Sequence, residues 1–369
     1  MIQSVLAWLL TVACLINAGA PPGFAAPQTG AASPNDTARF LAGLPPAPGS
    51  PLEALANEPG WQKYAKQFET EWAALETRQL SKVRAWSAKT LGPSKPTLYY
   101  MFSGPDFLYA HSMFPTASTY VLSGLEPIGR VPDILSVPRG GVPTVLGNLR
   151  ASLSDVLSRS YFITSHMEQK LRRGQLAGVL PVLYVFLART GNTIEEVGYL
   201  SLQPDGSVKP FDGTTPATTP KAVKIGFKSR EGTPQTLYFF STNVANKAVA
   251  ESGFLKFCAA LGAGDALIKS ASYLPHGGPF SSVRELIMKQ AQRIVQDDTG
   301  VPLRLYKEGE WKVEPFGIYT RPIPPFTYAY QPLMRKLYDK HKPAPLDFSY
   351  GYRWRQNQSN VVLATKIAR

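Results

Sequence analysis

Large apolar side chains recur at helical spacing from Trp61 onward. They stand three or four positions apart at Trp61, Tyr64, Phe68, Trp72 and Leu75 and, after a drift in phase, at Val83 and Trp86. Charged residues fill the positions between them, which is typical of an amphipathic helix, and Leu91-Gly92-Pro93 ends the pattern. We expect one long N-terminal helix whose aromatic stripe packs in the core. Exposure of Trp61, Phe68 and Trp72 would instead indicate an assembly component that docks through this helix.

After this helix the pattern changes to short apolar runs separated by turns. Three runs predict buried strands, at Thr97 to Ser103 (TLYYMFS), Thr119 to Ser123 (TYVLS) and Val179 to Leu187 (VLPVLYVFL). A helical pattern around Leu146 to Arg172 lies between the last two runs. The chain therefore continues as strands and helices in alternation.

A second set of elements resembles the first, because its opening run TLYFFS matches TLYYMFS in its first three residues. The predicted order is strand Thr236 to Ser241, helix Gly253 to Leu261, strand Ala266 to Tyr273, helix Val283 to Gln296 and strand Pro302 to Tyr306. Both sets place a helix between strands, which is compatible with an internal duplication into halves 93–200 and 221–369. Chance similarity between aromatic strands explains the match equally well.

These patterns predict one large α/β domain over residues 60–369. Alternating strands and helices favour a mostly parallel sheet flanked by helices. Residues 200–228 read as a hairpin with a polar loop, which would make the sheet mixed. The two halves could form one continuous sheet or two stacked ones.

The first 25 residues have the pattern of a secretory signal peptide. The apolar run from Val5 to Ile16 is shorter than the about 20 residues that a membrane-spanning helix needs. Small residues follow it, and we expect cleavage after Ala25, with Ala20 as the competing point. Lipidation of Cys14 is the alternative, although the usual leucine three positions upstream is missing. The chain should then be exported, to the periplasm or beyond.

Residues 26–59 are rich in proline, alanine, glycine and serine. Such a composition buries too little apolar surface to offset the entropy lost on ordering, so we expect a flexible linker. After removal of the leader no apolar run approaches membrane-spanning length, and Cys258 is the one cysteine left, expected as a small buried hydrophobe.

The chain carries a formal net charge of +13 and a pI near 9.6. A basic protein attracts anionic neighbours, and in the envelope these are a lipid surface, lipopolysaccharide or a cell-wall polymer. An envelope protein is a further candidate partner, and nucleic acid is not expected.

Established catalytic motifs are missing from the sequence. It contains no P-loop, no G-x-G-x-x-G, no G-x-S-x-G, no H-E-x-x-H and no C-x-x-C. The four histidines lie in separate segments, so we expect no metal site, and the sequence points to no cofactor. Asp298-Thr299-Gly300 spells the aspartic-protease triplet, but it follows a predicted helix and occurs once, so we reject that class.

Polar residues at the ends of predicted strands form the candidate site. Ligands of open α/β sheets bind beyond the carboxyl ends of the strands. The residues at such ends are Ser103, Asp106, His111, Glu126, Ser241, Asn243 and His276. Of these, Ser103, Asp106 and His276 are the catalytic candidates, and Glu126, Ser241 and Asn243 are candidates for binding a ligand.

Two arginines near the C-terminus complete the candidate binding residues. If residues 350–355 are extended, Tyr350, Tyr352 and Trp354 share one face while Arg353 and Arg355 share the other. The basic face would then be free to bind an anionic ligand.

Asp297 and Asp298 are excluded as partners of His276. The helix predicted before them has about 14 residues at about 1.5 Å each, and it would carry the two aspartates about 20 Å back across the sheet. We therefore expect them at the opposite edge, in a turn or paired with a base such as Arg304.

Three stretches carry a resemblance to known sequences: Tyr99 to Gly129, Ile294 to Arg304 and Pro343 to Gln356. Together they resemble a family of uncharacterised exported bacterial proteins. The resemblance implies a bacterial envelope location and adds no reaction and no catalytic residue.

Two functional hypotheses remain from the sequence. The leading one is a non-catalytic binding or accessory protein of the envelope with a basic surface. The alternative is a hydrolase in which Ser103 or Asp106 is the nucleophile or base and His276 the general acid/base.

Overall fold

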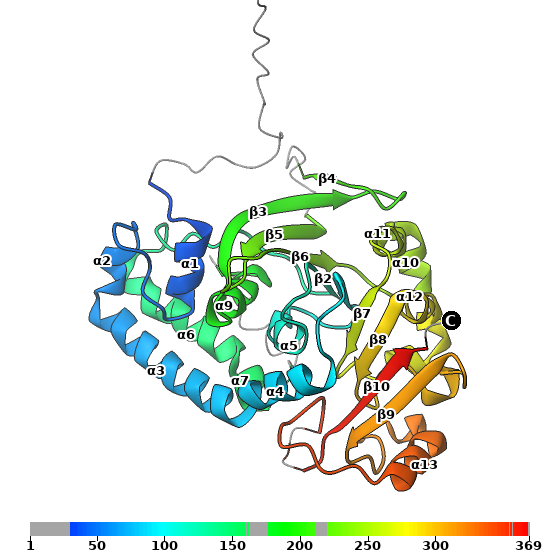
Figure 1. Ribbon diagram of the computed structural model, residues 1–369. Helices are drawn as coiled ribbons and strands as arrows, with labels where there is room; N and C mark the ends of the chain where they lie inside the picture. Colours follow the sequence, from blue (N-terminus) through cyan, green and yellow to red (C-terminus); the bar gives the residue numbers. More distant parts are fainter. Residues whose placement is uncertain are drawn as a thin grey trace, which may run out of the picture.

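The computed structural model describes residues 30–159, 161, 176–211, 220–353, 355 and 357–367. The described strands form one ten-stranded sheet in the order β4-β3-β5-β6-β2-β1-β7-β8-β10-β9 (Figure 1). Their bounds are β1 Thr97–Tyr100, β2 Thr119–Gly124, β3 Thr193–Leu202, β4 Val208–Pro210, β5 Ala222–Lys228, β6 Pro234–Ser241, β7 Gly264–Ile268, β8 Ala291–Gln296, β9 Trp311–Gly317 and β10 Asn360–Lys366.

The centre of the sheet is parallel and its two sides are antiparallel. Strands β6, β2, β1, β7 and β8 run in one direction. Antiparallel pairs add β5, β3 and β4 on one side and β10 and β9 on the other. Every residue of β1 and β7 is buried, as expected for parallel strands covered on both faces. The predicted α/β fold with a mixed sheet is confirmed.

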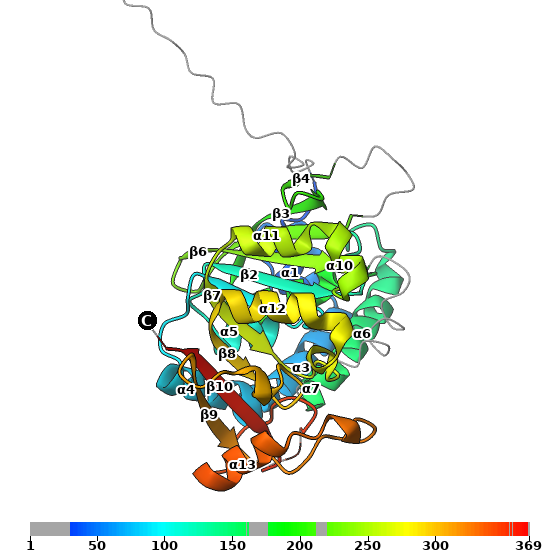
Figure 2. The ribbon, with the colours of Figure 1, turned by 90° about the vertical axis from the view of Figure 1, so that its right-hand side faces the viewer.

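Helices cover both faces of this sheet. One face carries α1 Pro34–Leu41, α2 Glu53–Ala56, α3 Pro59–Leu75, α4 Ser81–Thr90, α5 Phe107–Met113, α6 Val142–Ser152, α7 Ser154–Arg159 and α9 Leu180–Arg189. The other face carries α10 Asn246–Ser252, α11 Phe254–Ala260 and α12 Ser281–Gln290 (Figure 2), and α13 Pro332–His341 packs beside β9. Neighbouring residues of β1 enter opposite cores, since Tyr100 packs with the first group and Tyr99 with the second.

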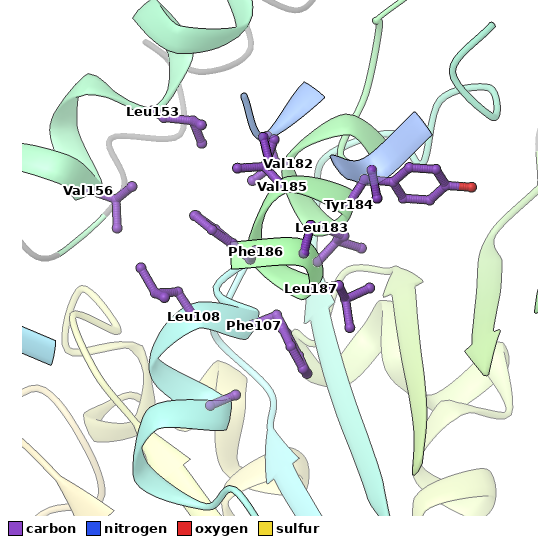
Figure 3. Close-up of a cluster of buried hydrophobic side chains, with 14 of the residues drawn as sticks. Phe107, Leu108, Leu153, Val156, Val182, Leu183, Tyr184, Val185, Phe186 and Leu187 are labelled. Carbon is purple, nitrogen blue, oxygen red and sulfur yellow. The ribbon is translucent and has the colours of Figure 1, made fainter. Parts of the chain in front are cut away.

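The run Val179 to Leu187 is helix α9, so its prediction as a strand was wrong. Figure 3 shows its side chains between Phe107 and Leu108 of α5 on one side and Leu153 and Val156 on the other. The helix is buried from Leu180 through Ala188. A helix that is apolar all round has the same sequence pattern as a buried strand, and Pro181 is compatible with the first turn of a helix.

The predicted helix around Leu146 to Arg172 is two helices, α6 and α7, as far as residue 159, and most of the remainder lies outside the described residues. The predicted helix Val283 to Gln296 ends at Gln290, after which β8 begins. The predicted strand Pro302 to Tyr306 contains the 3-10 turn Leu303–Leu305 instead. Strand β7 ends at Ile268 and not at Tyr273.

These changes remove the repeating pattern that suggested a duplication. The third predicted strand of each set is not a strand, because Val179 to Leu187 is helix α9 and Pro302 to Tyr306 contains a 3-10 turn. Strands of both sets interleave in one sheet, because β1 and β2 lie between β6 and β7.

The linker predicted over residues 26–59 was wrong from residue 30 onward. Helix α1 begins after Ser33, whose Oγ accepts a hydrogen bond from the Asp36 N–H at 2.9 Å. Phe40 of this helix is fully buried and stacks on Trp61 at a ring distance of 5.3 Å. The composition is that of a linker, but a few large apolar residues are enough to fix the segment on α3.

The predicted long N-terminal helix is confirmed with one irregularity. A π-helical turn at Glu76–Leu80 joins α3 to α4 and accounts for the drift in the apolar phase. Trp61, Phe68 and Trp72 are buried against the body, so the stripe is core and not a docking surface. Residues 1–29, with the predicted leader and Cys14, lie outside the described part of the chain. Within the described part, no helix is long and apolar enough to span a membrane.

Candidate functional site

A cleft of about 260 Å³ lies at the carboxyl ends of the parallel strands. The chain leaves β1 toward β2 on one side and returns to β7 on the other, so β1 and β7 flank the topological switch point where ligands bind in such sheets. We call it the strand-end cleft. Its polar lining consists of Ser103, Asp106, Ser123, Glu126, Thr242, Asn243, Lys269, Ser270, Ser272, Tyr100, Tyr161 and Tyr352.

A buried ion pair forms the floor of this cleft. Lys269, the first residue after β7, places its Nζ 2.8 Å from Oδ2 of Asp106, and their side chains are 1% and 3% exposed. Tyr100 donates its hydroxyl to the same oxygen at 2.9 Å, and Oδ1 accepts the Tyr109 N–H at 3.1 Å. The ammonium also lies 3.6 Å from the centre of the Tyr109 ring. The carboxylate of Asp106 is therefore fully engaged.

Burial shifts the pKa values of the two members of this pair in opposite directions. It raises the pKa of the Asp106 carboxyl, while the charge of Lys269 opposes the rise. It lowers the pKa of the Lys269 ammonium, and the charge of Asp106 opposes that change. Each charge makes the burial of the other tolerable, so the two act as a neutral unit.

Ser103 and Glu126 lie where the sequence predicted, at the ends of β1 and β2. The Ser103 hydroxyl donates to the carbonyl oxygens of Gly104 at 2.7 Å and Ser123 at 3.3 Å. Glu126 is buried with its carboxylate against two glycines: a Cβ on Gly124 would meet Oε2 at 2.0 Å, and one on Gly104 would meet Oε1 at 3.0 Å. Glycine at these two positions makes room for the carboxylate.

The other strand-end candidates are distributed differently. Asn243 lines the strand-end cleft, and its Oδ1 accepts the Ala245 N–H at 2.9 Å. Ser241 is the last residue of β6, where its N–H donates to the Lys221 carbonyl at 2.9 Å. His111 packs on the rings of Phe107 and Tyr120 within the core side of α5.

His276 lines a second cleft, of about 530 Å³, beside the first. It ends the 3-10 turn Leu274–His276 (η3), and burial lowers the pKa of its imidazole to about 4. Among the described contacts, Ser103, Asp106 and His276 share no hydrogen bond with one another. Their catalytic roles remain predictions that these contacts do not favour.

Arg353 and Arg355 do not line the strand-end cleft. The Arg353 guanidinium donates to the carbonyls of Arg321 and Pro322, so it braces a loop. Arg355 lines a separate hollow with Arg78 and Lys82. The aromatic face of this segment reaches the cleft instead, because Tyr352 donates its hydroxyl to the Ser270 carbonyl at 2.8 Å.

Asp297 and Asp298 follow β8 and therefore lie at the carboxyl edge, where we had excluded them. Because residues 291–296 are a strand and not the end of a helix, the chain reaches this edge again. The carbonyls of Asp298 and Gly300 lie close to the His276 ring. The triplet Asp298-Thr299-Gly300 follows strand β8 and not the end of a helix, and its single occurrence remains the argument against an aspartic protease.

The two aspartates hold the loop that follows β7. Asp297 Oδ2 accepts the Ser270 N–H at 3.0 Å, and Asp298 Oδ2 accepts the Tyr273 hydroxyl at 2.7 Å. Thr299 Oγ1 accepts the Ala271 N–H at 2.8 Å. We call residues 270–273 the β7–η3 loop.

This loop is strained. Ser270, Ser272 and Tyr273 have φ values of 53°, 49° and 54°, in the left-handed region that residues other than glycine seldom adopt. Such conformations persist where surrounding contacts impose them, and they concentrate at functional sites. The loop contributes residues to both clefts, so the buried aspartates act by positioning their shared wall.

We expect Asp297→Asn to flatten the pH dependence of stability between pH 5 and 7. Burial, reinforced by the charge of Asp298, raises the pKa of Asp297 to about 7, against about 3.9 in the unfolded chain. Between these values the folded chain holds a proton that the unfolded chain releases. The free energy of unfolding should therefore fall as pH rises, by up to about 1.4 kcal/mol per pH unit. Urea unfolding at pH 5, 6 and 7 measures both slopes, and equal slopes would contradict the raised pKa.

Within the described residues, no group of three or more His, Cys, Asp or Glu side chains is placed to hold a metal ion. Comparison with known protein families finds no family model that matches this chain, and no curated protein matches it either.

Proposed function

We propose that this protein is a non-catalytic binding protein of the bacterial envelope whose strand-end cleft takes a small uncharged ligand rich in hydroxyl groups, such as a sugar. Besides the paired Asp106 and Lys269 and the buried Glu126, the polar side chains that line the cleft belong to serine, threonine, asparagine and tyrosine. These groups both donate and accept hydrogen bonds, as the hydroxyls of a sugar require.

The observation that carries the proposal is the ion pair of Asp106 with Lys269. Among the described residues that line the cleft, Lys269 is the only cation, and Asp106 neutralises it. Among these described lining residues, an anionic ligand would therefore meet no unpaired positive charge. The same pair occupies the carboxylate that a hydrolase would use as its base, and the Ser103 hydroxyl already donates to backbone carbonyls.

The proposed location rests on the predicted leader and on the resemblance to exported bacterial proteins. The charge of +13 then belongs to the surface, where it would hold the protein near an anionic envelope component. Anionic attraction and cleft binding are separate roles in this proposal. The mass of the mature chain tests the location, since cleavage after Ala25 leaves Ala26 as its first residue.

The binding proposal is tested by titrating the protein calorimetrically with neutral sugars: glucose, galactose, mannose, N-acetylglucosamine and their disaccharides. We expect at least one to bind, and Asn243→Trp to weaken it by about tenfold or more, because the indole would fill the exposed end of the cleft. Asn57→Trp is the matched control, because it places the same indole on an exposed asparagine outside the cleft, and it should retain affinity within about threefold.

Two outcomes would contradict the proposal. One is that none of these sugars binds. The other is that Asn243→Trp binds a sugar as tightly as the parent protein does.

A further inference from the structure

The second cleft, which we call the tyrosine cleft, displays aromatic side chains to solvent. Its rim is formed by the 3-10 turn Thr327–Ala329 and the residues that lead into α13. Tyr328 is 77% exposed, Tyr330 45% and Leu333 49%. Large apolar side chains held out of the core in one short segment mark a binding surface.

Other aromatic rings pack against Tyr328 and Tyr330 and hold them in place. The Tyr330 ring stacks on Tyr319 at 6.3 Å with an interplanar angle of 15°. Tyr328 packs on Phe326 at 6.2 Å, and Phe326 packs on Tyr273 at 5.0 Å. The rings are therefore positioned before any ligand arrives, which lowers the entropy that binding must overcome.

Gln331 fixes the floor between these rings and the body. Its Nε2 donates to the Asp298 carbonyl at 3.2 Å, and its Oε1 accepts the Leu303 N–H at 2.8 Å. The tyrosine cleft is thus tied to the same buried aspartates that hold the β7–η3 loop.

The charge in this cleft is positive. Arg304 lines it and makes no ion pair or hydrogen bond through its side chain with the described residues. No acidic side chain is among the described residues of the lining. A planar guanidinium without a partner is suited to a carboxylate, which it can hold through two parallel hydrogen bonds.

We propose that the tyrosine cleft binds a sugar unit that carries a carboxylate. The apolar C–H face of the pyranose ring would pack on Tyr328 or Tyr330, and the carboxylate would pair with Arg304. The tyrosine rings and the Arg304 guanidinium together favour an acidic sugar over a neutral sugar or an apolar ligand.

The two clefts share Ser272, Leu274 and Phe280. One glycan can therefore occupy both, with an acidic unit in the tyrosine cleft and a neutral unit in the strand-end cleft. The proposal that one glycan occupies both clefts rests on the proposed function. The binding of an acidic sugar in the tyrosine cleft does not depend on it.

The test compares galacturonate with galactose, which differ by the carboxylate, in calorimetric titrations at low salt. The parent protein should prefer galacturonate, and Arg304→Gln should remove the preference, with a loss of about tenfold or more. Lys307→Gln removes the same charge three positions away, on a side chain that is 76% exposed, and should leave the preference intact. Tyr328→Ala should weaken galacturonate binding in the same assay.

The outcomes separate this inference from the proposed function. Galacturonate binding that survives Asn243→Trp and fails in Arg304→Gln supports the tyrosine cleft whether or not neutral sugars bind elsewhere. Equal losses in Arg304→Gln and Lys307→Gln would reduce the effect to general charge attraction and overturn the inference. Binding lost in Asn243→Trp but kept in Arg304→Gln would overturn it as well, by placing the acid in the strand-end cleft.

Discussion

Lys269→Met is expected to destabilise the protein by about 3–5 kcal/mol. The substitution leaves the Asp106 carboxylate buried without its counter-ion, and an uncompensated buried charge is among the most destabilising changes a core can receive. Urea unfolding at pH 7 measures the loss. Lys256→Met is the matched control: its ammonium is exposed and donates to the Pro204 carbonyl, so we expect a change within about 0.5 kcal/mol.

The double variant Lys269→Met with Asp106→Asn isolates the charge. An asparagine can still accept the Tyr109 N–H at the start of α5, so the cap of that helix is kept while the buried charge is removed. We expect it to recover about half or more of the loss. A single variant that loses less than about 1 kcal/mol would show that the pair is not isolated from water.

Gly351→Ala is the second large effect, with an expected loss of about 2–5 kcal/mol. Gly351 has φ of 67°, and a Cβ there would lie 1.9 Å from Oδ2 of Asp297. The left-handed backbone costs an alanine about 1–2 kcal/mol, and displacing the carboxylate from its buried hydrogen bonds costs about 1–3 kcal/mol more. Chemical denaturation provides the measurement.

Gly92→Ala separates the two contributions. Gly92 has φ of 63°, and a Cβ there would meet nothing within 4 Å, so this variant should lose the backbone contribution alone. The excess loss in Gly351→Ala reports how firmly Asp297 is held. If both variants lose the same amount, the carboxylate moves aside freely, and it cannot be what imposes the strained β7–η3 loop.

The sequence predicts the fold correctly where the spacing of apolar residues is compatible with only one kind of secondary structure. The runs TLYYMFS, TYVLS and TLYFFS are too short for helices of usual length and rich in β-forming residues, and they became β1, β2 and β6. The stripe from Trp61 to Trp86 fits only a helix. In both cases the spacing of apolar residues determines which surface can be buried.

The predictions of secondary structure were wrong where a helix and a strand would bury the same residues. The run around α9 is apolar on every side, so its periodicity cannot distinguish helix from strand. Residues 291–296 continue the apolar pattern of α12, and no glycine or proline marks where the helix ends and β8 begins. Tertiary pairing with β7 and β10 decides that boundary, and it is not visible locally.

The candidate site was affected by the same error. Ser103, Asp106, Glu126 and Asn243 were found because they follow strands that were recognised. The helix predicted over residues 283–296 puts Asp297 and Asp298 at the wrong edge, because its last six residues form strand β8. Lys269 lies inside a predicted strand that runs to Tyr273, and the lysine directly after the apolar run Ala266-Leu267-Ile268 is the signal that could have revealed it.

Strand β10 lies between β8 and β9, although it follows β9 by more than 40 residues in the chain. During synthesis, β8 therefore presents an open edge until residue 366 has been made, and open edges invite pairing with other chains. The same order of synthesis keeps the sheet unfinished until its last strand has been made.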